Sequence, residues 1–173
     1  MLEAAILLIF PFCMVFAAVS DMISMTIANR VSVLLVLAFA VLAPLTGMVW
    51  PDIGMHLAAG MVVLAITFAL FAIGGMGGGD AKLMAATTVW FGFSMGLLNY
   101  LMISALVGGA LTIALLIFRN SSLSMLAGNN LLLRHFADEK AGIPYGVALG
   151  IGGLFTFGQT PLAQWAMMHL AAG

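Results

Sequence analysis

Six long apolar runs separated by short segments constrain this 173-residue chain more than any other feature. A helix needs about 20 residues to cross the hydrocarbon core of a bilayer, so six crossings use about 120 residues and leave roughly 50 for loops and ends. We therefore predict an all-α, polytopic integral membrane protein with a single transmembrane domain over residues 1–173. The predicted helices cover residues 4–20, 31–49, 53–73, 83–98, 100–118 and 143 to about 157.

The scarcity of charge excludes other classes of protein. Hydrophobic residues make up 64% of the chain and charged residues only 6%, whereas about a quarter of an average soluble domain is charged. Five basic against six acidic residues form no patch that could follow a nucleic-acid backbone. The single cysteine, Cys13, lies within the first apolar run. It supports neither an internal disulfide nor a CxxC metal site, and we expect it to be a small buried residue.

The basic residues predict an orientation. All five lie in odd-numbered loops: Arg30, Lys82, Arg119, Arg134 and Lys140. Because basic loops stay cytoplasmic, we expect loops one, three and five inside and both termini outside. The first run lacks the basic start of a signal peptide and is predicted to be a retained helix.

The remaining segments carry weaker expectations. Short outer turns are expected at residues 50–52 and at Asn99, while the long loop 119–142 would suit an amphipathic segment on the cytoplasmic face. Residues 161–172 are too short to span alone, and we expect them to lie at an interface or to extend the sixth helix.

Two of the six acidic residues are candidates for chemistry. Asp21 ends the first apolar run, and Asp80 precedes the fourth, both on the predicted cytoplasmic side. Acidic residues at the membrane boundary are costly and are functional candidates for that reason. The other four lie at the terminus, in an outer turn or beside Lys140: Glu3, Asp52, Asp138 and Glu139.

Two neighbouring carboxylates would share one proton near neutral pH. The ionised one can activate water and the protonated one can donate to a peptide carbonyl, which requires no metal or cofactor. The helix dipole suggests that Asp80, at a helix start, holds the charge and that Asp21, at a helix end, holds the proton. The glycine-rich residues 74–79 would let an extended substrate approach closely; a flexible loop remains the alternative.

These residues resemble a known family. Residues 77–83, Gly-Gly-Gly-Asp-Ala-Lys-Leu, match the GxGDxKL motif of type IV prepilin peptidases, which are aspartic proteases. In its small Tad/Cpa-type members an aspartate at the end of helix one is followed by Ile-Pro-Asn, and here Asp21 is followed by residues 27–29, Ile-Ala-Asn. Residues 143–148, Ile-Pro-Tyr-Gly-Val-Ala, also resemble the start of the family's last helix.

The resemblance implies an enzyme that removes the basic leader of Flp-like prepilins or pseudopilins at the cytoplasmic face of the bacterial inner membrane. Asp21 and Asp80 would be its catalytic pair. Residues expected to bind substrate or shape the site are Gly77, Gly79, Lys82 and Asn29. Lys82 could instead reach lipid phosphates, and Asn29 could instead cap the second helix.

Departures and alternatives remain. Ala28 replaces the usual proline of the first motif, which should loosen the turn, and residues 22–26 lack the arginines common there. The methyltransferase domain of larger relatives is not expected. His56 and His169 are expected outside and His135 inside, so they should not share a metal.

Two other functions stay open: a small transporter or channel, and a non-enzymatic subunit of a pilus or secretion machine. Homo-oligomerisation is also open.

Overall fold

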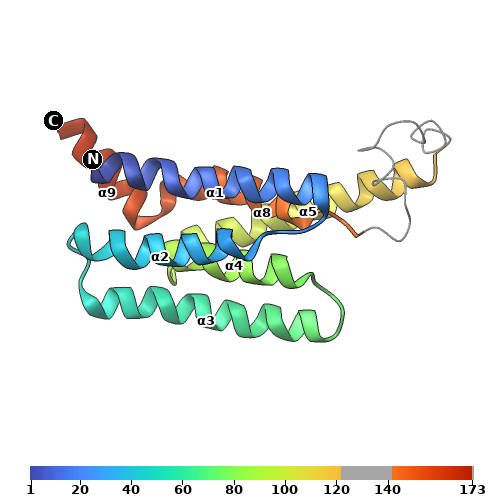
Figure 1. The fold of residues 1–173 in the computed structure, drawn as a ribbon, viewed down its shortest axis with the longest axis horizontal. Helices are drawn as coiled ribbons and strands as arrows, with labels where there is room; N and C mark the ends of the chain where they lie inside the picture. Colours follow the sequence, from blue (N-terminus) through green and yellow to red (C-terminus); the bar gives the residue numbers. More distant parts are fainter. Residues whose placement is uncertain (122–141, 173) are drawn as a thin grey trace.

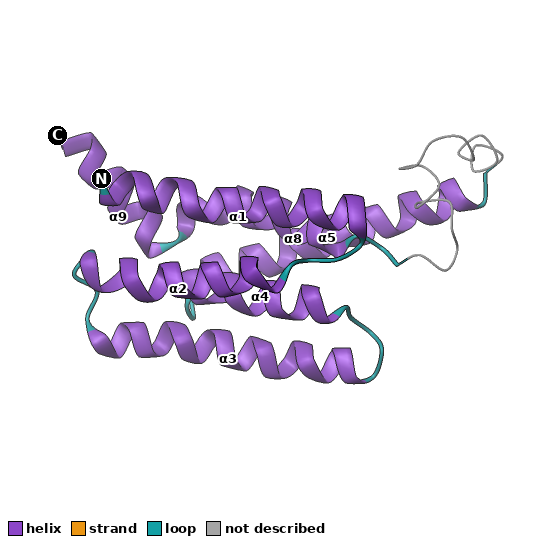
Figure 2. Cartoon of the chain, viewed as in Figure 1, coloured by secondary structure: helices purple, strands orange, loops and turns teal. Residues whose placement is uncertain are grey.

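A computed structural model describes residues 1–121 and 142–172, and every regular element in these ranges is helical (Figure 2). This confirms the all-α prediction for the described chain. The helices are α1 (Leu2–Ser24), α2 (Asn29–Leu45), α3 (Trp50–Ala72), α4 (Gly78–Phe91), α5 (Met95–Arg119), α8 (Tyr145–Thr156), the 3₁₀ turn η2 (Phe157–Gln159) and α9 (Pro161–Ala172).

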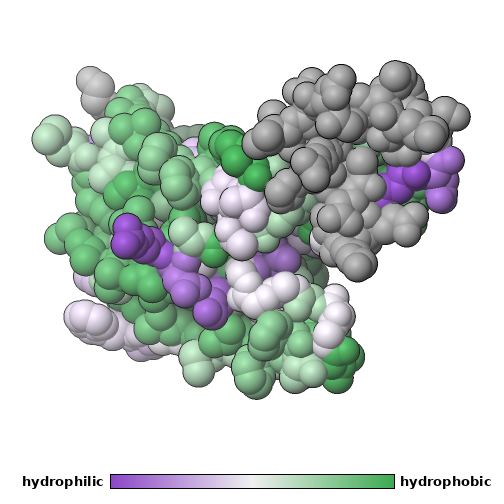
Figure 3. Space-filling model, turned by 45° about the vertical axis from the view of Figure 1, so that its right-hand side comes forward, coloured by the Kyte–Doolittle hydropathy of each residue, from purple (hydrophilic) through white to green (hydrophobic). Residues whose placement is uncertain are grey.

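The surface of the described chain is that of a membrane protein. Three helices are long and apolar enough to cross a bilayer, namely α1, α3 and α5, and α2 is a shorter apolar helix. Large apolar side chains point outward along them, with Phe12 65% exposed and Leu106 67% exposed. The space-filling view is mostly hydrophobic, with hydrophilic residues confined to small groups (Figure 3). Such a surface is stable in lipid, whereas in water it would drive association.

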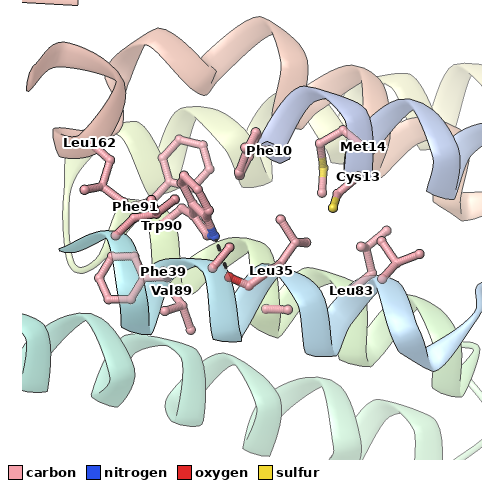
Figure 4. Packing of buried hydrophobic residues seen from close by; sticks show 14 of the residues in the cluster. Phe10, Cys13, Met14, Leu35, Phe39, Leu83, Val89, Trp90, Phe91 and Leu162 are labelled. Carbon is pink, nitrogen blue, oxygen red and sulfur yellow. Dashed lines mark hydrogen bonds between the residues drawn. The ribbon is translucent and has the colours of Figure 1, made fainter. Parts of the chain in front are cut away.

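Helix α4 lies at the centre of the bundle. It packs against α2, α3 and α8, while α1 packs against α2, α8 and α9 (Figure 1). Nearly every residue of α4 from Ala81 onward is buried, because its alanines and threonines let neighbouring backbones approach closely. Trp90 anchors the far end of α4: it is fully buried, and its indole Nε1 donates to the Leu35 carbonyl at 3.0 Å (Figure 4).

The connections between helices gather at two ends of the bundle. The α1–α2 connection, the α3–α4 connection and the start of α8 lie at one end, and both termini lie at the other (Figure 1). The described basic residues Arg30, Lys82 and Arg119 begin α2, begin α4 and end α5, respectively, so they belong to the same end. This arrangement matches the predicted grouping of basic loops.

Three predicted boundaries are wrong. The outer turn expected at residues 50–52 is the first turn of α3, and the chain turns at residues 46–49 instead. Helix α4 begins at Gly78 and ends at Phe91 rather than covering 83–98, and Asn99 lies inside α5 rather than in a turn. Gly92, with φ of +61°, ends α4, and the Ser94 side chain caps α5 by accepting a hydrogen bond from the Leu97 N–H. A glycine in this conformation followed by a serine N-cap is a helix break, although hydrophobicity continues through it.

The C-terminal segment does not extend the sixth helix. After α8 the chain passes through η2 and the extended residue Thr160, and α9 then packs against α1. Leu162, Ala163 and Ala166 are the buried residues of α9. The predicted amphipathic segment within 119–142 falls almost wholly outside the described residues, as do His135, Asp138 and Lys140.

Candidate active site

Asp21 lies in the last turn of α1 and is almost fully buried, with 5% of its surface exposed. Its carboxylate Oδ2 accepts a hydrogen bond of 2.7 Å from the backbone N–H of Gly146, in the first turn of α8. A side chain at Gly146 would collide with Asp21, because an added Cβ would lie 2.8 Å from the Asp21 Cβ. The glycine therefore allows the start of α8 to receive the carboxylate.

Asp80 lies in the first turn of α4, ahead of the apolar part of that helix, and is partly buried. Gly77 is the N-cap of α4, and the Asp80 carboxylate folds back over it: a Cβ on Gly77 would lie 2.6 Å from Asp80 Oδ2. An acidic side chain at this position can satisfy a free N–H of the helix start. The missing side chain of Gly77 thus makes room for the carboxylate.

The two aspartates belong to one electrostatic unit. Burial first, and the charge of Asp21 second, raise the pKa of Asp80 from its ordinary value to about 7, opposed by a hydrogen bond from the Gly77 backbone. Helices α1 and α4 also meet directly, since the Phe10 and Trp90 ring centroids are 5.1 Å apart. Helices α1 and α4 are therefore in contact, and the pairing of the two aspartates stays a prediction.

Ile27 lies between the segment that precedes Asp80 and the segment that holds Asp21. An added Cβ on Gly79 would lie 3.2 Å from the Ile27 Cβ, and one on Gly146 would lie 2.8 Å from the Ile27 Cδ1. Ile27 is buried with 9% exposed. Its side chain thus packs between the backbone that precedes Asp80 and the backbone that holds Asp21. The missing side chain of Gly79 thus makes room for Ile27.

The geometry changes the assignment of charge within the pair. The helix dipole predicts charge on Asp80, because the sequence places only Asp80 at a helix start. In the structure the Asp21 carboxylate also faces a helix start, that of α8, and accepts a hydrogen bond there. Since a helix N-terminus stabilises an anion, the helix dipole no longer singles out Asp80, and the hydrogen bond from Gly146 favours charge on Asp21.

Lys82 and Asn29 meet each other rather than the aspartates. The Lys82 Nζ donates to the Asn29 Oδ1 at 3.1 Å, and both side chains are exposed. The contact joins the starts of α2 and α4. The predicted role of these residues in holding substrate is not tested by this contact, which ties together the two helices that flank the site.

Two contributors were missed in the sequence. Gly146 supplies the amide that holds Asp21, and Ile27 supplies the packing between the glycines. Both lie in segments that carried the family resemblance, residues 143–148 and 27–29, but neither motif indicates which partner its residues meet. Gly146 and Asp21 are 125 residues apart in the chain, so only the fold reveals their contact.

The class of protein follows from comparison with known families. The sequence model of the type IV leader peptidase family matches residues 8–133. The chain therefore belongs to the type IV leader peptidase family, and its kind of function is that of a prepilin-type peptidase. The matched region contains both Asp21 and Asp80. Neither a curated protein nor a solved structure gave a significant match.

Proposed function

We propose that this protein is a membrane-embedded aspartic endopeptidase that removes the leader of Flp-like type IV prepilins or pseudopilins. The observation that carries the proposal is the placement of two acidic side chains at neighbouring helix starts, with the pKa of Asp80 raised to about 7 in part by Asp21. Two carboxyl groups that share one proton are the arrangement with which aspartic proteases hydrolyse peptides without a metal.

The catalytic cycle uses the two carboxyl groups in opposite roles. Asp21, held as an anion by the Gly146 N–H, takes a proton from water as that water attacks the scissile carbonyl carbon. Asp80 donates its proton to the carbonyl oxygen, which gives a neutral tetrahedral diol. On collapse, Asp21 passes its proton to the departing amine while Asp80 recovers a proton from the diol. The pair returns to its starting state, and one water has been consumed.

The glycine-rich connection between α3 and α4 would receive the substrate. Gly77 has extended backbone angles, φ −69° and ψ 141°, and is exposed beside the Asp80 carboxylate. A cleavable peptide needs an extended stretch to present its carbonyl, and glycine permits the closest approach of two backbones. Gly77 and Gly79 would shape this surface, while Lys82 and Asn29 would position the helix starts beside it.

The membrane orientation extends the proposal. Six crossings with both termini outside would put the aspartates at the cytoplasmic face of the bacterial inner membrane. The gathering of Arg30, Lys82 and Arg119 at the same end as the aspartates supports this, because basic loops stay cytoplasmic. A prepilin enters with its basic leader on that side and its apolar helix in the bilayer.

Co-expression with a short Flp-like prepilin tests the activity. Loss of the leader would appear as a mobility shift on a gel, and Asp21→Asn or Asp80→Asn should each abolish it while the protein still inserts. Asp52→Asn is the matched control, because Asp52 occupies the first turn of α3 and is exposed. Normal cleavage by either active-site variant would refute the assignment. Ion flux in liposomes without any cleavage would favour the transporter function instead.

A further inference from the structure

A groove separate from the aspartates opens between α2, α3 and α4. Its volume is about 760 Å³, which is within the range of about 300–1,000 Å³ of small-molecule sites. Helix α4 forms the floor with Ala85 and Ala86, while α2 and α3 form the walls. Its polar residues lie at one end, where Lys82 and Asn29 meet.

The groove exists because α3 lies closer to α4 than α2 does to α3. Gly60 of α3 touches α4 so closely that an added Cβ would lie 2.5 Å from the Val89 Cγ2. Contact between α2 and α3 is sparse compared with the contact that each makes with α4. The wall residues Val33 and Met61 remain 54% and 66% exposed. The walls therefore stand apart and leave an apolar channel over the small residues of α4.

The length of the groove matches one leaflet of a bilayer. Its α2 wall runs from Asn29 to Leu37, a rise of eight residue steps or about 12 Å along a helix. Half of the hydrocarbon core is about 15 Å. An extended occupant that enters the groove at its polar end would therefore end near the middle of the membrane, as a lipid acyl chain does. A helix that crosses both leaflets would have most of its length outside the groove.

The positive charge of Lys82 at the polar end of the groove favours a lipid with an anionic headgroup. Lys82 presents an ammonium group there, and Asn29 Oδ1 holds it in place. A cation at the mouth of an apolar channel complements an anionic phosphate above an acyl chain. A prepilin leader is basic and would be repelled by the same lysine. We propose that the groove is a binding site for one anionic phospholipid, with its phosphate on Lys82 and an acyl chain between Val33 and Met61.

The position of the site gives the lipid a structural consequence. Lys82 is two residues from Asp80 on the same helix, and Asn29 is two residues from Ile27, which packs between the glycines of the candidate site. A lipid on Lys82 and Asn29 would therefore brace the starts of α2 and α4. The binding itself is independent of peptidase activity and can be measured without any substrate.

Native mass spectrometry of the full purified chain tests the proposal. The probes are phosphatidylglycerol and phosphatidylcholine with identical acyl chains, and the readout is lipid retained per protein. The wild type should retain phosphatidylglycerol about tenfold better than phosphatidylcholine. Lys82→Gln should remove this preference and Lys82→Arg should keep it. Val33→Trp and Met61→Trp should fill the channel and lower retention of both lipids.

Leu106→Trp controls for an added tryptophan on the lipid-facing surface, because Leu106 is exposed on α5, outside the groove. It should retain lipid as the wild type does. The proposal would be overturned if Lys82→Gln kept the preference, or if the groove tryptophans retained as much lipid as Leu106→Trp. One-for-one displacement of phosphatidylglycerol by a prepilin-derived helix would overturn it too, and would assign the groove to the substrate.

Discussion

The two ends of helix α4 differ in what holds them. The far end is packed by aromatic side chains: Trp90 lies against Phe10 and Phe39, and His56 Nδ1 donates a hydrogen bond of 2.8 Å to the Val89 carbonyl. The near end has glycines at 77, 78 and 79, with Asp80 folded back over the helix start. The same fourteen-residue helix thus joins a dense core to a polar opening.

In the part of the chain that the structure describes, buried charge is confined to the near end of α4, beside helix starts. Dense packing at Trp90 fixes α4 relative to α1 and α2. The glycines at the near end therefore need no packed side chains to hold that end in position. Two acidic groups then face backbone amides of helix starts, which compensate buried anions. We expect substitutions at the far end to change stability and those at the near end to change activity.

The largest effect on stability is expected from Trp90→Ala. This substitution removes a fully buried indole and its hydrogen bond to the Leu35 carbonyl, at a typical cost of about 3–5 kcal/mol. Thermal unfolding in detergent should show the loss, and Trp90→Phe should show a smaller one. A Trp90→Ala protein as stable as the wild type would contradict the packed-end account.

Gly146→Ala is expected to produce the opposite pattern. The added methyl group would contact the Asp21 Cβ and the Ile27 Cδ1, each at 2.8 Å, and would displace the carboxylate from its amide. Leader cleavage should fall by about a hundredfold, the scale expected for a misplaced catalytic group, with a smaller loss of stability than for Trp90→Ala.

The matched control is Gly109→Ala, because a Cβ on Gly109 would meet nothing within 4 Å. Cleavage and unfolding temperature should both stay near wild type in this variant. If Gly146→Ala cleaved as well as Gly109→Ala, the contact between α8 and Asp21 would not matter for activity.

Much of this arrangement was predictable from the sequence. The apolar runs predicted helices, the basic residues predicted the end at which they gather, and the GxGDxKL-like segment predicted Asp80 at a helix start. The break at Gly92 was not predicted, because Phe93 and Met95 continue the apolar run past Gly92 and the Ser94 N-cap. The contact of Asp21 with the start of α8 was not predicted, because Gly146 is 125 residues away in the chain.

The pH dependence of leader cleavage tests the protonation state assigned to Asp80. The proposed cycle needs Asp80 protonated, and its pKa is about 7, so activity should be retained below pH 7 and decline above it. One unit above the pKa only about a tenth of the molecules hold the proton, so cleavage should fall about tenfold by pH 8. If the rate of leader cleavage did not change between pH 6 and 8.5, this assignment would be contradicted.

The raised pKa of Asp80 also predicts that the stability of the fold declines as pH rises towards and through 7. Asp80→Asn should reduce this decline in stability.

The smallest effect is expected from Ala28→Pro, which restores the residue usual in the family's first motif. Ala28 is the N-cap of α2 and has φ of −64°, which is the angle that a proline ring imposes. The loss of freedom in the unfolded chain should raise stability by about 0.4–1 kcal/mol. Denaturation in detergent would measure this gain, and a clear loss of stability would show that the turn depends on more than the φ of Ala28.

The central claim is that Asp21 and Asp80 together perform the hydrolysis. Its most direct test is the initial rate of leader release by purified protein in proteoliposomes, at saturating prepilin and pH 6.5. The account predicts that Asp21→Asn and Asp80→Asn each fall below about a thousandth of the wild-type rate, that the double variant is no slower than either, and that Asp52→Asn stays within about twofold. Either single variant cleaving within tenfold of wild type would contradict it.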